Sequence, residues 1–240
     1  MRCTVTICPV SAPNLSRRER VREQTLREIE QHALAQVAEG GVAALSLNAI
    51  AKAMGMSGPA IYRYFGSRDE LLAALITDGY RELGESVTTA AGATARRAPA
   101  RRLAAVAEAY LAWAHANPYR YDLLFSVRPA TYSDPAEAIE AIQPAMVTLL
   151  ELLGEIAGEA GAPAPGAKLE GQLRRWAAAR GDADAPPPGV LKLGVLAWSR
   201  LHGIASLELA GILGDMGLDA GLLAQAEVDD LVASARDTSR

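Results

Sequence analysis

The chain has 240 residues, 50% hydrophobic and 5% aromatic, and its 24 basic and 28 acidic side chains give a net charge of −4. This length allows a small domain and a larger one, and the abundance of Ala and Leu favours a helical protein. The negative net charge argues against a protein that coats nucleic acid over its whole surface.

The first 16 residues contain two prolines and predict a disordered tail. Cys3 and Cys8 have no His or further Cys near them, so we expect unconstrained thiols and no metal or redox site. The apolar run at the start is too short for a signal peptide, and no segment of ~20 apolar residues follows. The sequence therefore predicts a cytoplasmic protein with no membrane partner, no metal and no cofactor.

A first helix is expected from Arg17 to Glu39, because Leu26, Ile29, Ala33 and Val37 form one apolar stripe. The pair Gly40-Gly41 predicts its end.

Residues 45–72 have the pattern of two short helices joined by a tight turn at Gly55. Ser57 is placed to cap the second helix through its hydroxyl, and Pro59 falls in its first turn. The second helix should bury Ile61 and Phe65 and present Pro59, Tyr62 and Arg63 outward. This pattern is a helix-turn-helix, which indicates DNA as a partner. Residues 1–70 carry 9 basic against 7 acidic side chains and the remaining 170 carry 15 against 21, which suits a protein that contacts DNA with one end.

The rest of the chain predicts further helices and no strand. Ser67 should cap a fourth helix that continues toward Leu83. Later helices are expected over residues 101–117, 119–126, 135–160, 167–180, 189–214 and 219–236. The fold class is therefore all-α, with a tail (1–16), a three-helix DNA-binding domain with its connecting helix (17–85), and a larger helical domain for ligand binding and dimerisation (86–240).

These motifs together resemble the tetracycline-repressor (TetR) family of bacterial transcription regulators. The match rests on Ser46, Ile50-Ala51, Gly55-Met56-Ser57, Ile61-Tyr62-Arg63-Tyr64-Phe65 and Ser67-Arg68-Asp69-Glu70-Leu71. Tyr64 stands where the family usually has His, and Arg68 where it usually has Lys; both can donate to a phosphate. Trp198 and His202-Gly203 resemble a C-terminal subclass named for a Trp-His-Gly signature.

The resemblance and the geometry together predict a DNA-binding face. Arg63 can read guanine O6 and N7, and Gly58 allows close approach to the duplex. The other polar groups of this face suit phosphates, which position the protein without specifying sequence. The predicted DNA-binding residues are Ser46, Lys52, Ser57, Gly58, Pro59, Tyr62, Arg63, Tyr64 and Arg68.

The resemblance also implies a homodimer on an inverted-repeat operator, acting as a repressor and released by a small, largely apolar effector. Residues 190–213 are apolar nearly all round, so one face can meet a partner subunit. The predicted interface residues are Leu196, Gly203, Ile204, Leu207 and Leu223. The predicted effector-binding residues are Tyr110, Trp113, His115, Tyr121, Phe125, Trp198 and His202.

Other interpretations of the same residues stay open at this point. The aromatic residues and histidines could be ordinary core, and residues 190–213 could form the central helix of a monomeric bundle. A DNA-binding protein regulated by a protein partner, without a ligand, would have the same motif. An enzyme is disfavoured, because Gly55-Met56-Ser57-Gly58-Pro59 begins like a nucleophile elbow but lacks its last Gly and a preceding strand.

Overall fold

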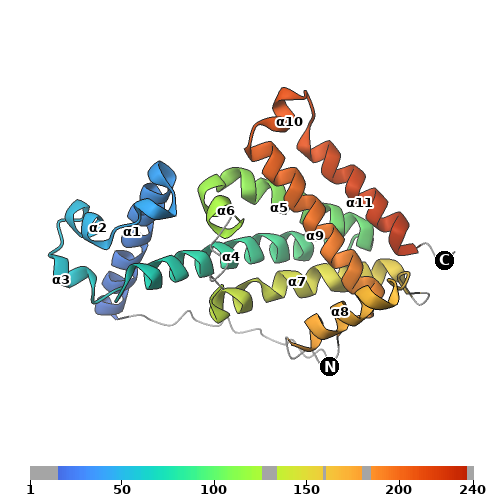
Figure 1. Ribbon diagram of the computed structural model, residues 1–240, viewed down its shortest axis with the longest axis horizontal. Helices are drawn as coiled ribbons and strands as arrows, with labels where there is room; N and C mark the ends of the chain where they lie inside the picture. Colours follow the sequence, from blue (N-terminus) through green and yellow to red (C-terminus); the bar gives the residue numbers. More distant parts are fainter. Residues whose placement is uncertain (1–15, 126–133, 159–160, 180–184, 237–240) are drawn as a thin grey trace, which may run out of the picture. The chain divides into compact units, whose positions relative to one another are not determined.

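The computed structural model describes residues 16–125, 134–158, 161–179 and 185–236, and these residues form helices and no strand (Figure 1). The predicted tail and both cysteines lie outside the described residues. No described helix is both long enough and apolar enough to span a bilayer. The elements are α1 (Arg17–Gly40), η1 (Val42–Ala44), α2 (Leu47–Ala53), α3 (Gly58–Ile61), α4 (Arg68–Ala93), α5 (Pro99–Ala116), α6 (Pro118–Phe125), α7 (Ala136–Ala157), α8 (Ala167–Ala178), α9 (Pro188–Leu209), α10 (Ile212–Asp215) and α11 (Ala220–Arg236).

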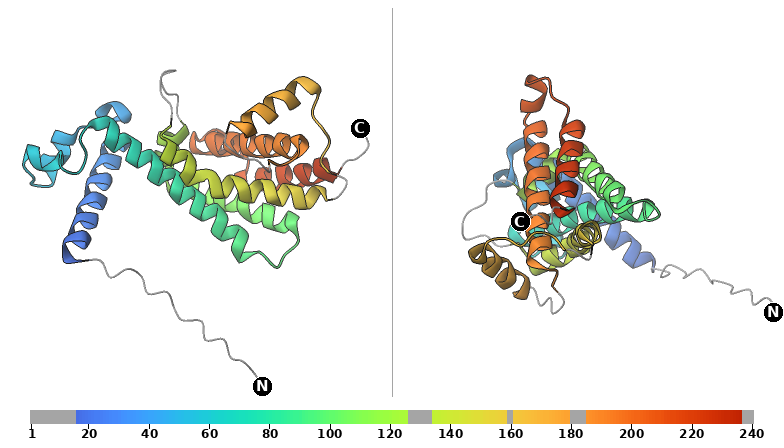
Figure 2. Two further views of the ribbon diagram at one scale, coloured as in Figure 1. Left: turned by 90° about the horizontal axis from the view of Figure 1, so that it is seen from below. Right: turned by 90° about the vertical axis from the view of Figure 1, so that its right-hand side faces the viewer.

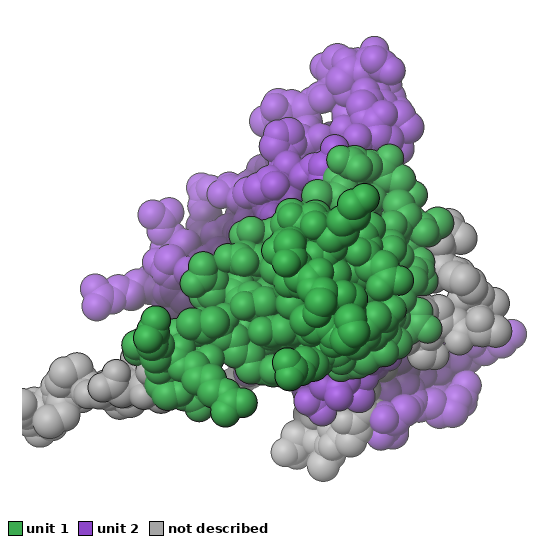
Figure 3. All heavy atoms as spheres, turned by 90° about the vertical axis from the view of Figure 1, so that its left-hand side faces the viewer, with its two compact units in different colours: residues 1–72 green, residues 73–240 purple. Residues whose placement is uncertain are grey.

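Two compact units divide the chain, a head (residues 1–72) and a body (residues 73–240), coloured separately in Figure 3. The division falls inside α4, earlier than the expected boundary at residue 85. The reason is that α4 belongs to the body from Ala73 onward. A Cβ on Gly79 would lie 3.2 Å from Leu124 of α6, and the Ser86 hydroxyl donates to the carbonyl of Ala109 in α5 at 3.4 Å.

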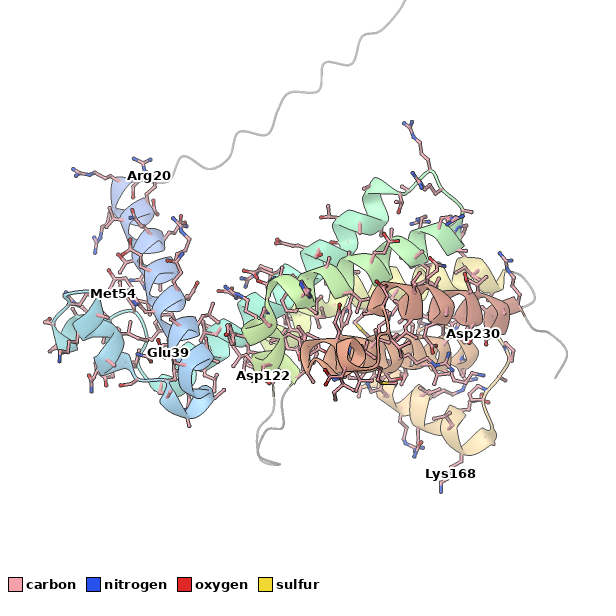
Figure 4. All side chains as sticks on the ribbon, turned by 90° about the horizontal axis from the view of Figure 1, so that it is seen from above. Arg20, Glu39, Met54, Asp122, Lys168 and Asp230 are labelled. Carbon is pink, nitrogen blue, oxygen red and sulfur yellow. The ribbon has the colours of Figure 1, made fainter. Side chains whose placement is uncertain are left out.

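The head is built around the predicted apolar stripe of α1. Ile29, Ala33 and Val37 are buried, and Leu26 is half-buried. Ser16 and Glu19 form a reciprocal capping box at the start of α1, and the Gly41 amide donates to Val37 O at its end. Figure 4 labels Arg20 and Glu39 near the two ends of this helix. The described helix thus agrees with the predicted span to within one residue.

The body has a core of four long helices, α5, α7, α9 and α11, which pack against one another. Figures 1 and 2 show α9 and α11 side by side. The short α8 covers α9 through a small cluster in which Leu173 and Ala177 meet Leu191. The interior of the body is mostly Leu, Val and Ala, as the composition predicts.

Two predicted helices end elsewhere in the structure. The fourth helix extends to Ala93 rather than about Leu83, because Ser86, Thr88 and the Ala-rich residues after them continue it into the body. The helix expected over 189–214 is two helices. Gly211 has a left-handed φ of 77°, which interrupts the helical ladder after Leu209 and starts α10 in a new direction.

Candidate DNA-binding face and the sites of the body

The helix-turn-helix forms as the sequence predicts. α2 buries Leu47, Ile50 and Ala51. Gly55 then takes a φ of 66°, in the left-handed region, and the Met56 amide donates to Ala51 O at 2.8 Å, which closes the end of α2. The chain is thereby turned into α3 within four residues of the end of α2.

The recognition segment presents two different faces. Ile61 and Phe65 are buried in the head, whereas Tyr62 is 47% exposed and Pro59 and Arg63 are exposed. Regular α-helix ends at Ile61, and the next turn is tightened by bonds from Arg63 N to Ala60 O and from Tyr64 N to Ile61 O. The outward face expected from the sequence is therefore present, on a shorter helix than expected.

Other predicted DNA-binding residues surround this face. Lys52, Ser57 and Gly58 are exposed, and a Cβ on Gly58 would meet nothing within 4 Å. The Ser57 hydroxyl does not cap α3, contrary to our expectation, so its oxygen accepts no bond from the first turn of that helix. The Ser46 hydroxyl accepts from Ala49 N at 3.4 Å and so caps α2, and this cap does not use the hydroxyl proton.

Tyr64 is held by a contact that sequence reasoning missed. The guanidinium of Arg22, on α1, lies 5.2 Å from the centre of the Tyr64 ring, within cation–π distance. Arg22 comes 42 positions earlier in the chain, and no local pattern pairs the two residues. The contact ties the recognition segment to α1 in the place where the family usually carries His.

The Arg68 side chain forms most of its hydrogen bonds within the head. Its Nε donates to Leu45 O at 3.1 Å and its Nη2 to Val42 O at 2.5 Å, while Nη1 lies 3.6 Å from the exposed carboxylate of Asp69. Two of its nitrogens thus bond the carbonyls around η1, and the expected phosphate contact stays a prediction for Nη1 alone. The side chain holds the start of α4 to the chain segment before α2.

In the body, five of the seven predicted effector residues come together from α5, α6 and α9. The rings of Tyr121 and Phe125 are 4.9 Å apart, and His202 lies 4.9 Å from Phe125, 5.5 Å from Tyr121 and 5.8 Å from Trp198. Tyr110 completes this aromatic cluster, 6.5 Å from Tyr121. These rings pack against each other.

The Tyr121 hydroxyl organises the polar atoms of this cluster. It lies 2.7 Å from His202 Nδ1, 3.0 Å from the His202 carbonyl and 3.0 Å from Ser206 Oγ. A hydroxyl has one proton and a carbonyl can only accept, so all three contacts are satisfied when Tyr121 donates to the carbonyl and both Nδ1–H and the Ser206 hydroxyl donate to Tyr121. Desolvation lowers the pKa of His202 below its usual 6.5, which favours this neutral form, and burial raises the pKa of Tyr121.

Trp113 and His115 do not join the aromatic cluster. Trp113 is buried, and its indole N–H has no partner among the described residues. His115 is exposed and lines a hollow of about 480 Å³ between α5 and α11. A shallower hollow lies along α4, around Ser86 and Thr89. No group of three or more potential metal ligands occurs within the described ranges.

The predicted dimer residues lie on the two helices expected. Leu196 and Leu207 of α9 are exposed, and Gly203, Ile204 and Leu223 are half-buried. A Cβ on Gly203 would meet nothing within 4 Å. Trp198, His202 and Gly203 share α9, although assignment to the Trp-His-Gly subclass stays a prediction.

Both units match known families. Residues 29–75 match the family described as bacterial regulatory proteins, tetR family, and residues 103–231 match the tetracyclin repressor-like C-terminal domain. The HTH-type transcriptional regulators Mb1846 of Mycobacterium bovis and Rv1816 of Mycobacterium tuberculosis are each 31% identical over 233 residues, covering 91% of this chain and 95% of theirs.

Solved structures agree. The crystal structure of SCO4313, described as a regulatory protein, is 40% identical with a TM-score of 0.74 and covers 91% of this chain and 100% of that one. The TetR-family regulator PfmR from Thermus thermophilus, at 19% identity and a TM-score of 0.54 over 85% and 97% of the two chains, shows the shared fold. The matched families and curated relatives are regulators of transcription and not enzymes.

Proposed function

Because the chain belongs to the TetR family of DNA-binding transcriptional regulators, we propose that it is a repressor that binds an inverted-repeat operator as a homodimer and is released by a small effector. The observation that carries the proposal is the exposed face of Pro59, Tyr62 and Arg63, opposite buried Ile61 and Phe65. Such a face leaves its exposed side chains available to base edges, while the buried side chains of the same segment pack into the head and fix its position.

Base reading falls to Arg63 in this proposal. It is exposed and unpaired among the described residues, and a guanidinium can donate two parallel hydrogen bonds to guanine. Lys52, Ser46, Ser57 and the hydroxyls of Tyr62 and Tyr64 would contact phosphates, and Gly58 would allow the backbone to approach the duplex.

Dimerisation is supported by the apolar surface of α9 and α11. Leu196, Leu207 and Leu222 are exposed, Leu222 by 74%, and burying such large apolar side chains against a partner would remove them from water. A symmetric pair would present two heads to half-sites about one helical turn apart, roughly 34–36 Å.

Release by an effector requires a connection from body to head, and we propose α4 as that connection. Tyr80 of α4 lies edge-on to Phe125 at 6.1 Å, and Ser86 bonds to α5. A molecule that shifts α5 or α6 would therefore act on α4, which continues into the head as one helix.

Fluorescence anisotropy on a duplex selected from a random pool tests the proposal. We expect binding of that duplex at least 10³-fold tighter than of a scrambled duplex at the same salt, with a stoichiometry of two chains per duplex. Equal affinity for both duplexes would contradict sequence-specific binding. Specific binding by one chain per duplex would contradict the dimer. A selected site that no metabolite releases would favour regulation by a protein partner.

A further inference from the structure

We propose that the hollow between α5 and α11 binds a small organic cation with an apolar body, such as an alkylammonium. The role of the hollow as the effector site rests on the proposed function, but binding of the cation can be measured without DNA. The hollow has a volume of about 480 Å³, within the usual range for small-molecule sites.

The floor of the hollow is apolar and its polar groups are mainly acidic. Ala and Leu side chains of α5 and Ala224 and Val228 of α11 line it, together with the carboxylates of Glu108, Glu208 and Asp219. No Lys or Arg is among the lining residues. An apolar body would displace water from the floor while a cationic head satisfies the carboxylates, whereas an anion would be repelled.

Two of these carboxylates have no partner in the described parts of the chain. Neither Glu108 nor Glu208 has an ion pair or a side-chain hydrogen bond there. Asp219 uses Oδ1 to accept the Leu222 amide at 2.8 Å, which leaves Oδ2. The carboxylates of Glu108 and Glu208 and the Oδ2 of Asp219 are thus open to a bound cation.

On α11, the hollow and the predicted dimer residue lie on different faces of the helix. Residues two apart on an α-helix point about 200° from one another. Gly221 and Gln225 line the hollow, and Leu223 lies two residues from each of them. The predicted interface residue of α11 therefore points to the side opposite the hollow.

The site also has a physical connection to α4. Glu108 lines the hollow, and the adjacent residue Ala109 accepts the hydrogen bond from Ser86 through its carbonyl. A cation that draws α5 and α11 together would shift this carbonyl and the α4 hydroxyl bonded to it.

Isothermal titration calorimetry with octyltrimethylammonium, octanoate and 1-octanol, each below its aggregation concentration, tests the site on the full chain. We expect saturable binding of the cation, and at least tenfold weaker binding of the acid and the alcohol. The double variant Glu108→Gln/Glu208→Gln should weaken cation binding roughly threefold to tenfold, the scale of losing two partly exposed ion pairs. Glu151→Gln, an exposed carboxylate on α7 outside the hollow, should leave it unchanged.

Three outcomes would overturn the proposal: no cation binding at millimolar concentration, equal binding of octanoate, or undiminished binding by the double variant. Ala112→Trp gives a second check, because Ala112 is an exposed lining residue and an indole there would fill the hollow without disturbing the core. Retained cation affinity in Ala112→Trp would also contradict the site. Failure of specific DNA binding in the separate anisotropy assay would overturn the proposed function and leave the calorimetric result standing.

Discussion

At the residue scale, Arg63 and Arg68 show how similar side chains differ in their surroundings. Arg63 is exposed on the outward face, whereas Arg68 donates to two backbone carbonyls in the head. The motif placed both residues correctly along the chain. It could not separate their roles, because the carbonyls of Val42 and Leu45 reach Arg68 only after folding, across more than 20 residues.

Arg63→Ala should weaken binding of the selected duplex by about 1–3 kcal/mol and relax preference at one base pair. Lys52→Ala is the matched control: Lys52 is also exposed and basic but is expected to meet phosphate, so it should weaken all duplexes alike and reduce the salt slope by about 1. Anisotropy over a panel of single-base variants at several salt concentrations measures both effects. A uniform loss across the panel for Arg63→Ala would assign Arg63 to the phosphates.

The His202 imidazole should titrate below its usual value. Desolvation lowers its folded-state pKa, so the unfolded chain takes up this proton first as the pH falls. The contribution of His202 to stability is therefore present above about pH 6.5 and is lost as the pH falls through the folded-state pKa. NMR of the His202 ring should show a midpoint below 6.5, and His202→Gln should flatten the dependence of unfolding free energy on pH between 7 and 5. A midpoint above 6.5 would contradict a neutral, Nδ1-protonated His202.

At the scale of elements, the features that depend on local sequence patterns were predicted correctly. The stripe of Ile29, Ala33 and Val37 and the Gly55 turn were predictable, since each requires one residue type at one spacing. The break at Gly211 was missed because the apolar pattern continues through it, and Gly203 on the same helix shows that Gly alone does not end a helix. The five residues of the aromatic cluster were predicted to come together, but sequence alone does not say whether their rings surround a space or pack against each other.

Gly55 and Gly58 should respond differently to the same change. Gly55→Ala puts a Cβ on a residue with φ of 66°, so it should cost about 1–2 kcal/mol of head stability. A Cβ on Gly58 meets nothing in the protein, so Gly58→Ala should leave the melting temperature unchanged and weaken DNA binding by crowding the duplex. Chemical denaturation and anisotropy on both variants separate the effects. Unchanged DNA affinity in Gly58→Ala would place this turn away from the duplex.

At the scale of the whole molecule, the proposal depends on two copies of one surface meeting. Gly203 lies between exposed Leu196 and Leu207 on α9, and a Cβ there has open space within the single chain. Because the single chain leaves room for this Cβ, we expect a larger side chain at this position to act mainly through a second copy.

Gly203→Leu should shift the protein from dimer to monomer in sedimentation velocity at micromolar concentration. The single chain should stay folded, since Leu is favoured over Gly in a helix by up to about 1 kcal/mol. Gly92→Leu is the matched control, a helical glycine of α4 that also has open space around its Cβ, and it should remain dimeric. Because the two heads bind one operator together, Gly203→Leu should also lose most operator affinity while keeping the salt-dependent binding of a single head. A dimer of unchanged stability in Gly203→Leu would exclude this part of α9 from the interface.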